Sequence, residues 1–221
     1  MNKFKAALFD LDGTLVETES QYTIFWGETA RKYRPDVPRL EYIIKGTTLT
    51  QIYNNYFPDP QIQEEITRGL DAFEGQMKFP FIDGAMEFLR DLKRNGVKMA
   101  VVTSSNKKKI DVALRAIPEM MSLFDRILTS EDFAASKPNP DCYLKGAEVF
   151  ECEKDECVVF EDAFTGLQAG MSSGIMTIGL ATYNSREAIQ DKCHHVIDNF
   201  EGMSYDTVAE LLAKRNKQNG N

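Results

Sequence analysis

The sequence has few of the residues that usually bind transition metals or form disulfides. It contains two histidines, His194 and His195, and four cysteines, none of which forms a Cys-x-x-Cys pair. Adjacent histidines lack the spacing of a metal site, so we assign them no role. A chain of 221 residues can bury a core without disulfides, so we expect free thiols in a reducing cytosol.

Long apolar runs and an excess of basic charge are also missing. No stretch reaches the roughly 18 apolar residues of a membrane span, and the apolar segment ending at Phe9 is too short for a signal peptide. The formal net charge is −8, which gives no electrostatic attraction to nucleic acids or to anionic membranes. We therefore expect a cytoplasmic monomer that binds neither nucleic acid nor membrane.

Short apolar runs alternate with helical patterns over most of the chain. The runs typical of buried strands are 4–9, 97–103, 126–129, 157–160 and 175–179. The helical patterns between them are 84–95, 106–116, 141–150 and 163–173. This alternation predicts an α/β fold with a Rossmann-like parallel sheet that is covered by helices on both faces. The polar end of the chain, 214–221, is expected to fray.

One long segment, residues 17–78, interrupts the alternation. It contains no strand-like run, and its helical patterns are 20–33, 40–44, 49–57 and 61–77. A segment of this length is too long for a loop. We predict a small α-helical cap domain at 17–78, inserted into a catalytic core that consists of 1–16 and 79–221.

Acidic pairs follow two of the predicted strands. Asp10 and Asp12 follow the first apolar run, with Gly13 permitting a sharp turn, and Glu161 and Asp162 follow a later run. The carboxyl ends of parallel strands share one edge of the sheet, so these acids should converge. Carboxylates this close repel one another unless a cation or a proton lies between them. Taken singly, an Asx turn at Asp12 and helix capping by Asp162 are the alternatives.

Other polar residues at loop starts could bind an anion. Thr103 ends an apolar run, and its hydroxyl could hold a phosphate oxygen at the start of the next helix. Helix capping by Ser104 or Ser105 is the alternative for this segment. Lys137 lies between Ser136 and Pro138-Asn139-Pro140, and the prolines would hold it rigid. An isolated lysine would more often be exposed on the surface.

Together these motifs resemble those of the haloacid dehalogenase superfamily, in its branch of β-phosphoglucomutases and sugar-phosphate phosphatases with a helical cap. The matching motifs, in order, are Asp10-Leu11-Asp12-Gly13-Thr14, Thr103, Lys137 in Lys-Pro-x-Pro, and Glu161-Asp162. The resemblance covers nearly the whole chain. Each motif alone is weak, whereas four in order at predicted strand ends are a specific signal.

The resemblance also implies roles for these residues. Asp10 would attack phosphorus and form an aspartyl phosphate, and Asp12 would protonate the leaving oxygen and then activate water. Mg²⁺ would be held by Asp10, the backbone carbonyl of Asp12 and Asp162, with Glu161 close by. The implied phosphate-binding residues are Thr103, Ser104, Ser105 and Lys137.

The cap sequence departs from the mutase pattern. Mutases carry a histidine in the first cap helix and an arginine in a Lys-Gly-x-x-Arg motif, where this chain has Tyr22 and Leu49 but keeps Lys45 and Gly46. Without the arginine, one end of a bisphosphate intermediate loses a bidentate ligand. We therefore predict a Mg²⁺-dependent phosphatase acting on a small phosphorylated metabolite such as a sugar phosphate, with substrate contacts from Tyr22, Lys45 and Gly46. The alternatives are a mutase-type phosphotransferase and a non-catalytic phosphate-sensing protein.

Overall fold

The computed structural model describes residues 4–219 and contains one parallel sheet with the strand order β3-β2-β1-β4-β5-β6. The strands are β1 Ala6–Phe9, β2 Lys98–Val102, β3 Arg126–Leu128, β4 Cys157–Glu161, β5 Met176–Leu180 and β6 His195–Ile197. The α/β class and the parallel sheet are confirmed. The sequence analysis missed β6, because a three-residue edge strand is too short to show an apolar pattern.

Both faces of the sheet are buried, as expected for parallel strands. In β1, Ala7 and Phe9 point into one hydrophobic cluster, and Ala6 and Leu8 point into the other. The helices of the first face are α5 Ala85–Arg94, α6 Lys107–Ala116, α7 Pro118–Met121 and α11 Tyr205–Asn219. The helices of the second face are α8 Asp141–Glu148 and α9 Phe164–Ser173. The short α10 spans Arg186–Ile189 near β6.

The end of the chain differs from the expectation of a frayed tail. α11 continues to Asn219, so that expectation is wrong for residues 214–219, while 220–221 lie outside the described residues. Val208 and Leu212 of this helix are buried in the first cluster, and Asn216 Nδ2 donates to the Asp155 carbonyl at 2.8 Å. Packing on one face therefore holds a helix whose last turns are polar. Among residues 4–219, no helix is both long and apolar enough to cross a membrane.

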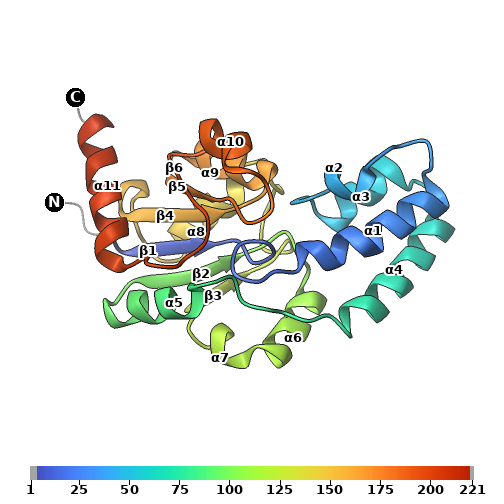
Figure 1. The fold of residues 1–221 in the computed structure, drawn as a ribbon, viewed down its shortest axis with the longest axis horizontal. Coiled ribbons are helices and arrows are strands. Elements are labelled where there is room, and N and C mark those ends of the chain that lie inside the picture. The colour runs from blue at the N-terminus through green and yellow to red at the C-terminus, as the bar shows by residue number, and fades with distance from the viewer. Residues whose placement is uncertain (1–3, 220–221) are drawn as a thin grey trace.

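The segment predicted as a cap forms helices beyond the carboxyl ends of the strands (Figure 1). These helices are α1 Glu19–Tyr33, α2 Leu40–Ile43, α3 Leu49–Tyr56 and α4 Pro60–Glu74. They surround a hydrophobic cluster of their own, which includes Trp26, Leu40 and Phe57. Local signals fix their starts: Thr48 and Gln51 form a capping box at α3, and Asp59 caps α4 before Pro60.

Two short connections join these helices to the sheet. Val16 pairs with Phe81 in an isolated antiparallel bridge, and the Glu17 N–H donates to the Pro80 carbonyl at 2.8 Å. The chain therefore leaves the core and returns to it at neighbouring points, so the sheet is not interrupted by the insertion.

Candidate active site

The acidic residues singled out from the sequence meet at the carboxyl end of the sheet. Asp10 follows β1, Glu161 ends β4, and Asp162 comes next. One carboxylate oxygen from each of the three lies within 4.8 Å of the other two, and all three residues are buried. The parallel topology brings them together, because β1 and β4 are neighbouring strands with Phe9 opposite Phe160.

Lys137 is the cation within this acidic group. Its side chain is 2% exposed, and its ammonium donates to Asp10 Oδ1 at 2.6 Å and to Glu161 Oε1 at 2.7 Å. A third hydrogen bond goes to the Val102 carbonyl at 3.2 Å. The alternative of an exposed surface lysine is therefore excluded. All three donors of the ammonium are satisfied, so its position is well defined.

One lysine does not balance three buried carboxylates. Burial raises the pKa of Asp10 to about 7, against the opposing effect of Lys137. Burial, with the neighbouring charge of Glu161, raises the pKa of Asp162 well above its usual range. Burial is the larger cause of both shifts and repulsion among the carboxylates adds to it, so a further cation beside them would favour their ionised forms.

The available oxygens fit a hard divalent cation such as Mg²⁺. Asp162 Oδ1 accepts from the Thr14 hydroxyl at 2.9 Å. Glu161 is already occupied by Lys137, by the Tyr143 hydroxyl at 3.2 Å and by the Ala163 N–H at 2.8 Å. Asp10 and Asp162 would therefore be the better side-chain ligands, and Glu161 holds Lys137.

Gly13 allows the loop after β1 to approach this group. Its φ of +81° lies in the left-handed region, and a Cβ there would lie 2.2 Å from Asp162 Oδ2. A larger residue would therefore displace the Asp162 carboxylate.

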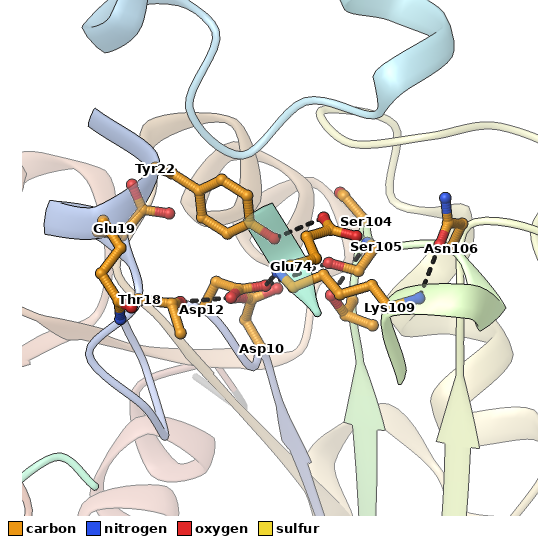
Figure 2. A network of polar contacts seen from close by, with 12 residues as sticks. Asp10, Asp12, Thr18, Glu19, Tyr22, Glu74, Ser104, Ser105, Asn106 and Lys109 are labelled. Atoms are coloured by element: carbon orange, nitrogen blue, oxygen red, sulfur yellow. Dashed lines mark hydrogen bonds and ion pairs between the residues drawn. The ribbon is translucent and has the colours of Figure 1, made fainter. Parts of the chain in front are cut away.

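The side chain of Asp12 is not part of the group of three carboxylates and lines the cavity, where Figure 2 shows it beside Thr18. It accepts hydrogen bonds from Thr18 and from Ser105, the latter at 3.1 Å, and it forms an ion pair with Lys109. Burial alone would raise the pKa of Asp12, but Lys109 and the two hydroxyls together lower it below its usual range. A metal at the acidic group would therefore meet the backbone of Asp12 rather than its carboxylate.

Sequence analysis missed Lys109 and Glu74. Lys109 is 4% exposed on α6, and its ammonium lies 4.4 Å from the centre of the Tyr22 ring. Tyr22 in turn donates from its hydroxyl to Glu74 Oε1 at 2.7 Å. The sole sequence signal for Lys109 is its place one residue before Ile110, on the buried face of α6. Nothing in the sequence predicts Glu74, because its place depends on how α4 packs against α1.

The remaining predicted residues surround the same cavity. Lys45 forms an ion pair with Glu19, and its ammonium lies 3.6 Å from the centre of the Tyr183 ring. The Gly46 carbonyl accepts from the Ser104 hydroxyl at 3.2 Å, and a Cβ on Gly46 would lie 2.3 Å from Thr165 Oγ1. Gly46 therefore makes a close contact between the helical segment and the core.

Thr103 and the start of α6 form the wall of the cavity on the side of the sheet, facing the helical segment. Thr103 is buried, and its hydroxyl accepts from the Ser105 N–H at 3.1 Å. The helix cap is Asn106, whose side chain accepts from the Lys109 N–H at 2.9 Å. Capping by Ser104 or Ser105 is therefore excluded. Both serines instead contact groups that line the cavity.

The cavity has a volume of about 510 Å³ and lies between the sheet edge and helices α1, α3 and α4. Asp10, Asp12, Thr103 and Lys109 line its core side, and Tyr22, Lys45 and Glu74 line its other side. This volume suits a small molecule.

Known proteins share this sequence pattern and this fold. The family model of haloacid dehalogenase-like hydrolases matches residues 7–180. Validoxylamine A 7'-phosphate phosphatase of Streptomyces hygroscopicus subsp. limoneus is 29% identical over 197 residues, covering 85% of this chain and 91% of that protein. Hexitol phosphatase A of Escherichia coli (strain K12) is 28% identical, covering 80% of this chain and 82% of that protein. The crystal structure of β-phosphoglucomutase from Clostridium difficile superposes with a TM-score of 0.80 at 21% identity, covering 96% of this chain and 98% of that one.

Proposed function

The chain belongs to the haloacid dehalogenase-like hydrolases, and on this premise we propose that it is a Mg²⁺-dependent phosphatase of a small phosphorylated metabolite, a sugar phosphate. The observation that carries the proposal is that Asp10 lies beside both Lys137 and Asp162, while Asp12 lines the cavity. The similarity to proteins named validoxylamine A 7'-phosphate phosphatase and hexitol phosphatase A supports the substrate class.

Asp10 and Asp12 divide the chemistry. Lys137 binds Asp10 Oδ1, and none of the residues 4–219 donates a hydrogen bond to Asp10 Oδ2 that would prevent its attack on phosphorus. Asp12, which is ionised beside Lys109, would take up a proton from solvent as the phosphate dianion of the substrate binds next to it. As the bond between Asp10 and phosphorus forms, the bond from phosphorus to the leaving oxygen breaks, and Asp12 gives that proton to the leaving oxygen. Water then attacks the aspartyl phosphate, Asp12 takes a proton from the water, and Asp10 is released with inorganic phosphate.

The transferred phosphoryl group carries charge that the site must balance. Mg²⁺, when bound by Asp10, Asp162 and the Asp12 carbonyl, would neutralise part of that charge. The hydroxyl groups of Thr103 and Ser105 lie at the same edge of the sheet and would donate to the phosphoryl oxygens. Lys137 would bind a phosphoryl oxygen by giving up its 3.2 Å hydrogen bond to the Val102 carbonyl, while it keeps those to Asp10 and Glu161.

We also propose that residues 17–78 act as a cap that closes over the substrate. Contacts between the helical segment and the core support this: Gln51 Nε2 donates to the Lys137 carbonyl at 3.2 Å, and Lys108 pairs with Asp71 at 2.5 Å. A closed cap would exclude bulk water and strengthen contacts to phosphate. It would also limit substrates to small molecules.

A mutase-type phosphotransferase is the second candidate, favoured by the likeness to a β-phosphoglucomutase structure. Leu49 and Tyr22 argue against it, because neither can bind a second phosphate as an arginine would. Incubation with β-glucose 1-phosphate and a bisphosphate primer distinguishes the two: a phosphatase releases inorganic phosphate, whereas a mutase forms glucose 6-phosphate. Hydrolysis of p-nitrophenyl phosphate excludes a purely sensing role.

Metal removal tests the proposal directly. We expect EDTA to abolish hydrolysis of p-nitrophenyl phosphate, Mg²⁺ to restore it and Ca²⁺ to inhibit it. Calcium prefers more ligands at longer distances and would misplace Asp10 relative to phosphorus. Phosphate release at each metal concentration is the measurement. Full activity in metal-free buffer would contradict the roles given to Asp10 and Asp162.

Lys45→Ala tests the cap. If the Lys45 ammonium donates to the substrate, kcat/KM should fall by about tenfold or more for the best sugar phosphate and much less for p-nitrophenyl phosphate. Lys32→Ala is the matched control, because Lys32 is an exposed residue of α1. An equal small change on both substrates would mean that Lys45 serves only its ion pair with Glu19.

A further inference from the structure

The cap side of the cavity presents a carboxylate to the substrate. Glu74 is the last residue of α4, is 8% exposed and lines the same cavity as Asp12. The Tyr22 hydroxyl, 2.7 Å from Glu74 Oε1, fixes its position (Figure 2). Lys109 connects this pair to Asp12, because its ammonium pairs with the Asp12 carboxylate and lies 4.4 Å from the centre of the Tyr22 ring. Because Asp12 serves the leaving oxygen, the leaving group must lie near Glu74.

Within the described part of the chain, no cation on the cavity wall is free of an ion pair. Among residues 4–219, the lysines that line the cavity are Lys45 and Lys109, and no arginine lines it. Lys45 is paired with Glu19, and Lys109 is paired with Asp12. A second anionic group on the substrate would therefore have to break one of these ion pairs.

The other groups on the wall favour an uncharged, hydroxyl-rich ligand. Besides Glu74, the acids that line the cavity away from Asp10 and Asp12 are Glu19, Glu41 and Glu131. Neutral hydrogen-bonding side chains also line the cavity, including those of Thr47, Gln51 and Ser130. Carboxylates accept hydrogen bonds from hydroxyls but repel phosphate and carboxylate groups that are not neutralised.

We propose that Glu74 is a specificity-determining residue that selects monophosphates with an uncharged polyhydroxyl leaving group and rejects substrates with a second anionic group. It does so by accepting hydrogen bonds from substrate hydroxyls and by repelling a second phosphate or carboxylate. This inference rests on the proposed phosphatase activity and names the substrate class for it. Lys45 can still donate to a hydroxyl, because an ammonium has three donors.

A pair of compounds that differ at one carbon tests this selection. Sorbitol 6-phosphate carries an alcohol where 6-phosphogluconate carries a carboxylate. We expect the full-length wild type, with Mg²⁺ at about pH 8, where carboxyl groups are ordinarily ionised, to favour sorbitol 6-phosphate in kcat/KM by about tenfold or more. This preference is measured as the ratio of the two kcat/KM values. If either compound is not turned over, the ratio of their inhibition constants against p-nitrophenyl phosphate hydrolysis is measured in place of the kcat/KM ratio.

Glu74→Gln should lower the preference for sorbitol 6-phosphate over 6-phosphogluconate, expressed as that ratio, by about fivefold or more. The amide keeps the shape of the side chain and removes its charge. A ratio is insensitive to a general loss of activity. Glu64→Gln, an exposed change on the same helix, should leave the ratio unchanged. Tyr22→Phe keeps Glu74 but removes its hydrogen bond, and should lower the ratio by about twofold or more.

Two results would overturn the inference while leaving the phosphatase intact. One is a wild type that treats the two compounds alike, and the other is a ratio unchanged in both Glu74→Gln and Tyr22→Phe. Failure of the proposed function differs from both, because p-nitrophenyl phosphate and every monophosphate would then remain unhydrolysed with Mg²⁺ present.

Discussion

Asp10→Asn should reduce turnover by a factor of the order of a thousand or more while leaving the fold intact. An amide cannot attack phosphorus, and it binds Mg²⁺ poorly. The fold should survive, because Lys137 keeps its hydrogen bonds to Glu161 and to the Val102 carbonyl. Steady-state kinetics with p-nitrophenyl phosphate measures the loss, and circular dichroism with thermal unfolding monitors the fold.

The matched control for this variant is Asp111→Asn, which makes the same chemical change on an exposed position of α6. It should retain wild-type kinetics. If Asp10→Asn kept more than about a tenth of the wild-type rate, Asp10 would not be the nucleophile. Rapid quenching with a radiolabelled phosphate donor adds a second measurement, because only the wild type should form an acid-stable phosphorylated protein.

Lys137→Met should destabilise the protein as well as inactivate it. Lys137 is buried and holds Asp10 and Glu161, so its removal leaves two buried carboxylates without their cation. Breaking a buried ion pair from one side costs about 3–5 kcal/mol, which lowers Tm by roughly 6–20 °C in a chain of this size. Urea unfolding in metal-free buffer measures the change in the free energy of unfolding.

Lys145→Met on α8 is the control, because Lys145 forms a partly exposed ion pair with Glu148. Its removal should lower the free energy of unfolding by less than about 1 kcal/mol.

The loss of stability in Lys137→Met should become smaller as the pH falls. Burial raises the pKa of Asp10 to about 7 even with Lys137 present, so the folded state takes up a proton there before the unfolded state does. Falling pH therefore favours the folded state, and more so without the lysine. A loss that is independent of pH between about 8 and 6 would contradict this account.

Strand order explains why the acidic group could be predicted and part of the cavity could not. Asp10, Thr103 and Glu161 each follow an apolar run, and parallel strands bring their carboxyl ends to one edge whatever the loops do. The contact between Lys109 and Tyr22 depends instead on how α6 faces α1, which no local pattern encodes. Buried polar residues on helices are for the same reason hard to distinguish from exposed ones in a sequence.

Short apolar segments and polar helix ends limit such prediction in a different way. β6 has three residues and gains its place by pairing with β5, with Ile178 opposite His195. α11 continues through residues with a polar pattern, because Val208 and Leu212 pack on the core. In both cases a tertiary contact outweighs local preference.

The paired connections at Val16–Phe81 and Glu17–Pro80 would make the proposed cap, residues 17–78, exchangeable. Since the chain leaves and re-enters the core at neighbouring positions, closing the gap with a short turn requires little additional loop entropy. Helices of another size or sequence could be grafted there without altering the register of β1 against β2 and β4. A chimaera that carries a foreign insert between Val16 and Phe81 would keep the phosphate-cleaving chemistry and acquire a new preference for the leaving group.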